Sequence, residues 1–207
     1  MKKLKLQKIS AFFIPEKELK SEIIRKAIHF LIALSPLMAS ISRQFTLFFL
    51  MAGICCYVLM EYLRLSGIKV PVISFLTRMA SRSTDTGSFV MGPVTLGLGA
   101  FFALLLFPSQ TAAIAIYALA FGDGFASLIG KFFGKRRPAF LLGKSIEGSI
   151  ACFAAVFIST YAVSSNIRIS IIAAFAAVAV EAMPLEDYDN IAIPVTVGIV
   201  VQLASFL

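Results

Sequence analysis

The chain has 207 residues, of which 59% are hydrophobic and only 14% are charged. Soluble domains are about 45–50% apolar, so this composition excludes a soluble globular domain and predicts an integral membrane protein, organised as a single domain over residues 1–207. The net charge is +8. Cys55, Cys56 and Cys152 lie in apolar runs without CxxC spacing, which indicates neither a zinc site nor a disulfide framework.

Seven apolar runs follow one another along the chain, at about residues 23–41, 45–62, 87–107, 111–129, 150–164, 169–183 and 191–207. A membrane-spanning helix needs about 20 residues. We therefore expect an all-α polytopic membrane bundle of about seven transmembrane helices, in which the short fifth and sixth runs recruit flanking polar residues. The basic segment 1–20 predicts an interfacial segment, and residues 68–82 predict a second interfacial helix or a long connection.

The distribution of charge predicts an orientation. If the N-terminus lies in the cytoplasm and seven helices alternate, then of the 19 Lys and Arg residues only Arg43 and Arg168 fall on the opposite side, in agreement with the positive-inside rule. All 11 acidic residues fall on or near the cytoplasmic face as well. We therefore expect a multi-pass membrane protein with its active site on the cytoplasmic face.

One stretch, residues 121–149, interrupts the apolar pattern. It contains the acids Asp123 and Glu147 and five cations, interleaved with glycines. Ser145 is expected to cap a helix that begins near Ile146, and the positive end of that helix would face the same place as Lys144. Mg²⁺ takes one or two carboxylates together with phosphate oxygens, so the stretch predicts a site for a nucleotide and a divalent metal. The alternative interpretation is a basic anchor for lipid headgroups.

Four other features of the sequence bear on the site. Asp123 ends thirteen largely apolar residues, and an ionised carboxylate in the hydrocarbon costs about 2.5–3.5 kcal/mol on insertion scales, so such acids are usually paired or functional. For Glu61 the alternative is an ion pair with Arg64. "GKS" is not a P-loop, because Pro138 stands where that motif needs glycine. The single histidine, His29, shares a helix face with Arg25.

Five motifs resemble, in order, those of the dolichol kinase, phytol kinase and CTP-dependent diacylglycerol kinase family. They are "RKAIHF" (25–30), "STDTGS" (83–88), "GDGFASLIGKFFGKR" (122–136), "GKSIEGS" (143–149) and "EDYDNIAIP" (186–194). The resemblance spans residues 22–194. It implies an integral membrane kinase that transfers the γ-phosphate of a nucleotide, typically CTP, to a lipid alcohol such as phytol, a polyprenol or dolichol, or diacylglycerol. The short chain resembles the compact phytol kinase and diacylglycerol kinase branch.

The resemblance and the charge pattern together assign roles to individual residues. Mg²⁺ or another divalent cation is expected on Asp123 and Asp189, with Glu181 as a third acid. The catalytic candidates are Asp123, Lys144 and Glu147, where Glu147 either orients the charged network or accepts the proton of the alcohol. The candidates for binding the nucleotide are Lys131, Lys135, Arg136, Lys144, Ser145 and Asn190. Further candidates are Arg25, His29, Glu61 and Asp85.

Two other functions remain open at this point. A CDP-lipid synthase, similar to phosphatidate cytidylyltransferase, would also need CTP, a divalent metal and a membrane site, but would release pyrophosphate. A non-enzymatic transporter or scaffold would turn over no nucleotide, and it leaves the clustering of acids on one face unexplained. The expected partners are a membrane lipid alcohol, a nucleoside triphosphate and the lipid bilayer, with no nucleic acid.

Overall fold

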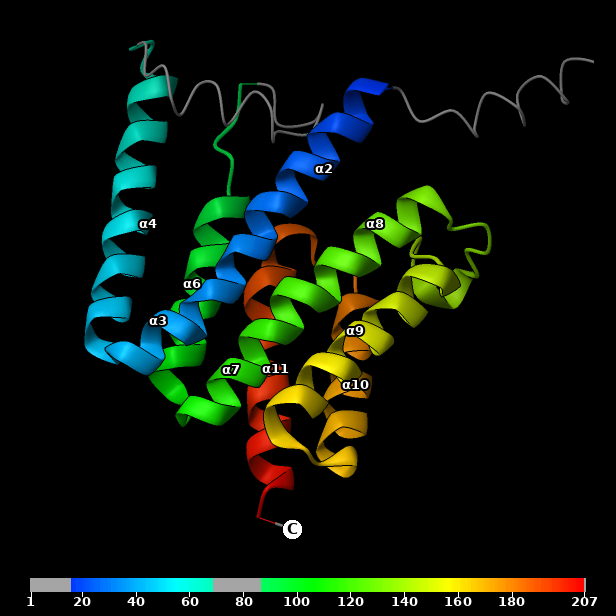
Figure 1. Cartoon of the computed structure of the whole chain (residues 1–207). Helices are drawn as coiled ribbons and strands as arrows, with labels where there is room; N and C mark the ends of the chain where they lie inside the picture. The colour runs from blue at the N-terminus through cyan, green and yellow to red at the C-terminus, as the bar shows by residue number, and fades with distance from the viewer. Residues whose placement is uncertain (1–15, 69–86, 207) are drawn as a thin grey trace, which may run out of the picture.

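The computed structural model describes residues 16–68 and 87–206, and within these ranges all regular structure is helical. Figure 1 shows the helices in chain order. Their bounds are α2 Glu16–Leu31, η1 Ile32–Leu34, α3 Ser35–Ile41, α4 Arg43–Leu65, α6 Gly92–Leu106, α7 Ser109–Tyr117, η3 Ala118–Asp123, α8 Gly124–Phe132, η4 Ala139–Leu141, α9 Ile146–Ser164, α10 Ile167–Glu181, η5 Glu186–Tyr188 and α11 Asp189–Ala204. The expected all-α helical bundle is confirmed.

Each of the seven apolar runs contains a helix or a set of consecutive helical segments, but only four are long and apolar enough to cross a membrane. These four are Ser21–Ile41, Arg43–Leu65, Ser109–Phe132 and Ile146–Ser164. Helices α6, α10 and α11 have 15, 15 and 16 residues. At about 1.5 Å per residue they are shorter than the roughly 30 Å hydrocarbon core. The structure therefore supports four spans, and the count of seven stays a prediction, as does the orientation.

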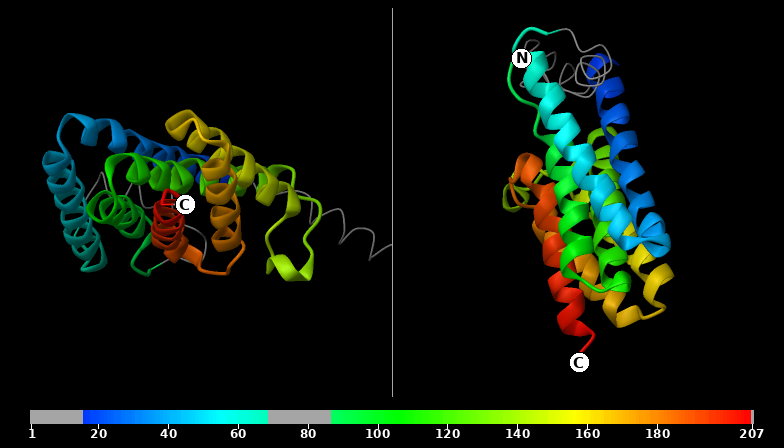
Figure 2. Two further views of the ribbon diagram at one scale, coloured as in Figure 1. Left: turned by 90° about the horizontal axis from the view of Figure 1, so that it is seen from below. Right: turned by 90° about the vertical axis from the view of Figure 1, so that its left-hand side faces the viewer.

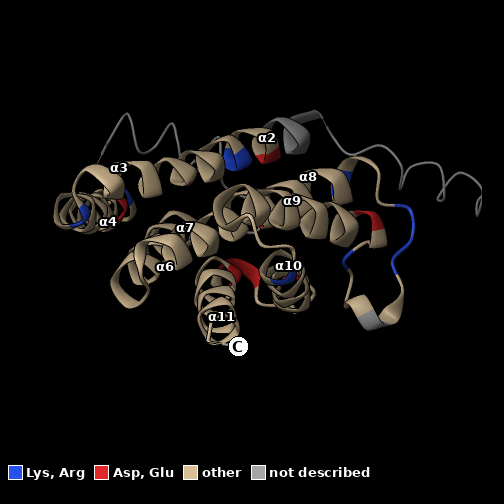
Figure 3. Cartoon of the chain, turned by 60° about the horizontal axis from the view of Figure 1, so that its bottom comes forward, with Lys and Arg blue, Asp and Glu red and all other residues tan. Residues whose placement is uncertain are grey.

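The continuous segment α7–η3–α8 forms the centre of the bundle. In its most apolar window 61% of the residues are buried, whereas the corresponding windows of the other three candidate spans are 17%, 17% and 22% buried. It packs against α2 and α3 on one side, against α9, and against α10 and α11 on the other. Figures 2 and 3 show α2 and α3 crossing one face of this layer while α10 and α11 lie on the opposite face.

Two glycines on either side of Asp123 allow neighbouring helices to approach the central segment. A Cβ on Gly122 would lie 2.8 Å from Val156 of α9, and a Cβ on Gly124 would lie 2.5 Å from the ring of Phe30 of α2. Both distances are too short for real contacts, so only glycine permits this packing. The glycines thereby bring α2 and α9 close to Asp123.

Two expected features lie largely outside the described residues. These are the interfacial N-terminal segment 1–20, of which only the start of α2 is described, and the connection 68–82.

Among the described residues, the charged positions lie mainly at helix ends and in connections. Figure 3 shows them on α2, in the loop between α8 and α9, at the start of α9 and between α10 and α11.

Candidate active site

The site is centred on Asp123, the last residue of a π-helical turn. Helix α7 widens at Ala118–Asp123 before continuing as α8. Such turns are rare and often occur at functional sites. The Asp123 side chain is only 3% exposed, although it lies inside a segment long enough to cross the membrane. A carboxylate in that position needs charged or hydrogen-bonding partners.

Helix α2 supplies these partners. The Lys26 ammonium group forms an ion pair with Asp123 Oδ2, and His29 Nε2 lies 3.2 Å from the same oxygen and 3.0 Å from the carbonyl oxygen of Leu119. Ser127 Oγ donates to Asp123 Oδ1 at 3.3 Å. The motif "RKAIHF" is thus folded directly against "GDG". Lys26, which the sequence analysis did not select, is the nearest cation to Asp123 among the described residues.

A cavity of about 470 Å³ opens beside this cluster, and we call it the first cavity. It is lined by residues of α2, α4, α6, η3 and α8, of the loop before α9, and of the segment from α10 to α11. Six of the residues selected from the sequence line it: Arg25, His29, Asp123, Lys144, Asp189 and Asn190. The structure therefore brings four separate motifs to one place.

The start of α11 is fixed beside α6. Asn190 Nδ2 donates to Thr95 Oγ1 at 2.9 Å, and the backbone carbonyl of Asn190 lies so close to Gly99 that a Cβ there would overlap it. Asp189 precedes the apolar run of this helix. Burial and the negative charge of Asp123 raise the pKa of Asp189 to about 7. Asp189 and Asp123 therefore interact across the first cavity as two like charges.

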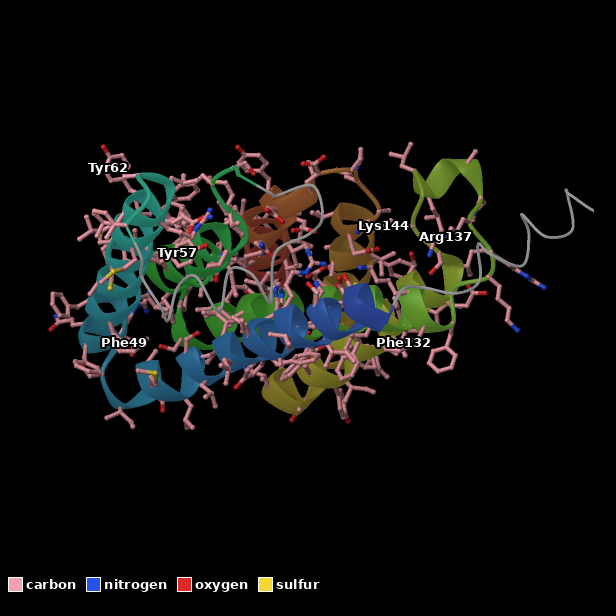
Figure 4. The ribbon with its side chains drawn as sticks, turned by 90° about the horizontal axis from the view of Figure 1, so that it is seen from above. Phe49, Tyr57, Tyr62, Phe132, Arg137 and Lys144 are labelled. Atoms are coloured by element: carbon pink, nitrogen blue, oxygen red, sulfur yellow. The ribbon has the colours of Figure 1, made fainter. Side chains whose placement is uncertain are left out.

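A smaller cavity of about 250 Å³ adjoins the first, and we call it the second cavity. Four cations line it: Arg25, Lys131, Arg137 and Lys144. Arg25, Ser127 and Lys144 line both cavities. Ser145 caps α9 by accepting from the Gly148 amide at 3.1 Å, as expected from the sequence, so the positive end of α9 faces this space. In Figure 4, Lys144 and Arg137 lie among polar side chains, whereas Phe49 and Tyr62 lie at the periphery.

Lys144 is held at the boundary between the cavities by an acid. Its Nζ donates to Glu181 Oε1 at 2.8 Å, while Glu181 Oε2 is buried without a hydrogen-bond partner among the described residues. Burial lowers the pKa of Lys144, but the Glu181 carboxylate outweighs burial, so that the net pKa is raised. Lys144 therefore keeps its positive charge in this half-buried position.

Three other predicted site residues lie outside both cavities. The Glu147 carboxylate accepts from the backbone amide of Arg136 at 3.4 Å. Lys135 and Arg136 are exposed on the loop between α8 and α9. Lys131 does line the second cavity and pairs with Glu22, which also accepts from Arg25 at 2.7 Å.

Two further candidates do not join the cluster. Glu61 is fully buried, accepts from Arg64 at 2.7 and 2.8 Å, and accepts from the Val90 amide at 3.1 Å. This confirms the alternative of a pair with Arg64. Asp85 lies outside the described residues.

The acids present fit a nucleotide-bound metal better than a metal held by protein alone. Among residues 16–68 and 87–206, no group of three or more His, Cys, Asp or Glu side chains is arranged to hold a metal ion. Mg²⁺ is usually held by one or two carboxylates plus phosphate oxygens. Asp189 and Asp123, both on the first cavity, would meet that requirement if phosphate oxygens supplied the remaining ligands.

Comparison with known proteins gives one curated relative. The chain is 28% identical to "Phytol kinase" of Synechocystis sp. (strain ATCC 27184 / PCC 6803 / Kazusa) over 148 residues, which is 67% of this chain and 62% of the relative. The chain therefore matches somewhat less than two thirds of that protein's length. No family model and no solved structure matches the chain. Together with the order of its motifs, this similarity supports a relationship to the polyprenol and phytol kinases.

Proposed function

We propose that the protein is a membrane lipid-alcohol kinase, which transfers the γ-phosphate of a nucleoside triphosphate, CTP in the first instance, to the hydroxyl of a prenol-type lipid. The observation that carries this proposal is the pair of adjoining cavities that share Arg25, Ser127 and Lys144. A kinase must hold two substrates with their reacting atoms together. The similarity to a phytol kinase supports the same assignment.

The triphosphate is assigned to the cation-lined second cavity and to the boundary at Lys144. Arg25, Lys131 and Lys144 would neutralise the phosphate oxygens, and the first amides of α9 would donate to them. Phosphoryl transfer depends mainly on positioning and charge neutralisation. The half-buried, positively charged boundary provides both, which the surface cations Lys135 and Arg136 do not.

The divalent cation is assigned to Asp189 and Asp123, with Glu181 as a third acid near the phosphates. When bound, the ion would offset the negative charge of the phosphate groups. Because Asp123 is already paired with Lys26 and His29, we assign the larger share of metal binding to Asp189. The role of Lys26 and His29 is to pair with Asp123 and orient its carboxylate in an apolar segment.

The transfer step follows from this placement. The hydroxyl oxygen of the lipid forms a bond to the γ-phosphorus, and the bond from that phosphorus to the β–γ bridging oxygen breaks, so that the nucleoside diphosphate leaves with the electron pair. The alcohol proton passes to a carboxylate or water in the first cavity. Glu147 lies outside both cavities. Of its two expected roles, we assign it to orienting the basic loop through the Arg136 amide.

Product analysis tests the proposal. Purified protein in neutral detergent is incubated with CTP labelled at the γ-phosphate, Mg²⁺ and a panel of lipid alcohols. A labelled lipid phosphate together with CDP is expected. A CDP-lipid together with pyrophosphate would instead identify a cytidylyltransferase, and no turnover with any nucleotide would identify a transporter or scaffold. Parallel reactions with ATP, GTP and UTP establish the preferred donor.

A further inference from the structure

Residues 133–145, which we call the α8–α9 loop, connect two candidate membrane spans. The span Ser109–Phe132 ends where this loop begins, and the span Ile146–Ser164 begins where it ends. Helices α8 and α9 pack against each other, so both ends of the loop lie at the same end of the bundle, as Figure 1 shows. A loop between two packed neighbouring spans emerges at one membrane surface. The α8–α9 loop is therefore close to the lipid headgroups.

The α8–α9 loop carries positive charge that the proposed nucleotide site does not use. Between Asp123 and Glu147 the sequence contains several cations but no acid, and Figure 3 shows basic positions along the loop. Lys135 and Arg136 are exposed and line neither cavity. Cations placed at a membrane surface are attracted to anionic headgroups. The two side chains are therefore available for a contact with lipid.

The same loop exposes two large apolar side chains. Phe133 and Leu142 are 62% and 61% exposed. Leu142 also has a φ of 49°, in the left-handed region of the backbone, which is unfavourable for a residue with a branched apolar side chain. An exposed leucine in this conformation gains little from packing against the described part of the chain. Such a local outlier indicates a contact outside the protein.

Hydrogen bonds hold the loop in a defined shape. The Arg137 guanidinium donates to the carbonyl of Gly143 at 2.6 Å and to that of Gly130 at 3.1 Å, which ties the two sides of the loop together. The Ile146 amide, at the start of α9, donates to the Arg136 carbonyl at 3.0 Å. The exposed cations and the exposed apolar side chains are therefore presented together by a structured loop.

We propose that the α8–α9 loop is a docking surface for anionic lipid headgroups. Phe133 and Leu142 insert among the lipids, while Lys135 and Arg136 contact the phosphate groups of the headgroups. Apolar insertion and basic charge bind a membrane surface stably when they act together, whereas either one alone binds weakly. The contact forms whether or not a nucleotide is bound. The basic stretch is thereby divided, because Lys144 lines the cavities and the loop cations face the membrane surface.

Tryptophan fluorescence tests the contact directly, because the chain contains no tryptophan. The full-length Leu142→Trp variant is placed in nanodiscs of phosphatidylcholine, with or without phosphatidylglycerol, that contain lipids brominated high on the acyl chain. Quenching by bromine and a blue-shifted emission are expected, with quenching at least about twofold stronger when phosphatidylglycerol is present. High salt is expected to reduce that difference. Emission that bromine does not quench would place the side chain in water or against another protein and would overturn the proposal.

Charge variants in the Leu142→Trp background test the role of the two cations. Lys135→Ala combined with Arg136→Ala is expected to abolish the dependence of quenching on phosphatidylglycerol. The control is Arg168→Ala, which removes an exposed cation from the start of α10, beyond the other end of α9, and is expected to leave that dependence unchanged. Equal effects of the two changes, or quenching that never depends on phosphatidylglycerol, would contradict the proposal. Phe133→Trp is the reporter if Leu142→Trp does not fold.

Discussion

Two acids in this molecule lie in similar apolar helices but have different kinds of partners. Glu61 and Asp123 each lie in a long apolar helix, and each is at most 3% exposed. Glu61 forms an ion pair with Arg64, three residues further along the same helix, and accepts a hydrogen bond from the Val90 amide. Asp123 pairs with Lys26 and His29, which are more than ninety residues away in sequence, and it lines a cavity.

The difference shows that burial of a charge does not by itself mark a functional site. The pair of Glu61 and Arg64 neutralises the acid within one turn of α4 and links α4 to the segment before α6. The pair of Asp123 and Lys26 joins α2 to the central segment, brings separate motifs together and leaves the Asp123 carboxylate at a cavity. The second arrangement needs tertiary structure to form, so it can hold substrates at the contact between elements.

The strongest test of this comparison is to remove each negative charge. Asp123→Asn is expected to leave less than about a tenth of the wild-type turnover, a loss of at least ~1.4 kcal/mol in transition-state stabilisation. Glu61→Gln is expected to lower the melting temperature and to retain turnover per folded molecule, because Glu61 lines neither cavity. Rates are measured as lipid phosphorylation in neutral detergent, normalised to folded protein. A nearly active Asp123→Asn variant would remove Asp123 from the site.

A second test compares two lysines of the basic stretch. Lys144→Ala is expected to reduce kcat/KM by about 10–100-fold, since a charge-assisted contact to phosphate is lost at a half-buried boundary. Lys135→Ala, which is exposed and lines neither cavity, is expected to change it less than about twofold. Arg137 is unsuitable as the control, because it donates to the carbonyls of Gly130 and Gly143. Similar mild losses that fade in high salt would favour the headgroup-anchor interpretation.

A third test addresses the close packing around Asp123. Gly124→Ala forces a Cβ to within 2.5 Å of the Phe30 ring, and overpacking of this kind costs about 1–3 kcal/mol of stability. The matched control is Gly53→Ala on α4, where a Cβ would meet nothing within 4 Å. Thermal unfolding in detergent is the measurement. The packing argument fails if both variants melt at the same temperature as the wild type.

The smallest expected effect concerns pH. Glu181 holds the pKa of Lys144 above its ordinary value against the opposing effect of burial. The stability that this pair contributes is therefore present below the ordinary lysine pKa and is lost as pH rises through the raised value. In Glu181→Gln, activity is expected to fall at a lower pH on the alkaline side than in the wild type. An unshifted alkaline limb, with intact folding at each pH, would show that Glu181 does not govern the charge of Lys144.

Much of the fold follows from hydrophobic periodicity and length alone. All seven apolar runs contain helices, Ser145 caps α9, and Glu61 pairs with Arg64. These features depend on neighbours within a few residues. The number of spans is harder to predict, because α6, α10 and α11 are buried by other helices as well as by lipid, so composition does not determine whether each one crosses.

The site was predicted only in part, because its contacts join segments that are far apart in sequence. Asp123, Lys144, Asp189 and Asn190 do line one cavity. Lys26 was missed because its neighbour Arg25 carries the same charge, although Glu22, Lys26 and His29 share the i, i+4, i+7 face of a helix. Glu147 was selected through the family resemblance as well as its charge, and Arg136 through its place in the basic stretch. Neither residue lines a cavity, however: Arg136 is exposed on the loop between α8 and α9, and Glu147 lies in the first turn of α9, where it accepts from the Arg136 amide.

The π-helical turn at Ala118–Asp123 has a consequence for the evolution of this chain. A π turn accommodates one residue more than an α-helical turn, as a single insertion into an older regular helix would do. Because the extra residue is absorbed within the turn, the helix beyond it keeps the direction of its faces. Deleting one residue from Ala118–Asp123 is therefore expected to leave the packing of α8 in place and to change only the side chains of the turn itself, among them Asp123. An insertion at this point can thus add the turn without rebuilding the packing of the rest of the span.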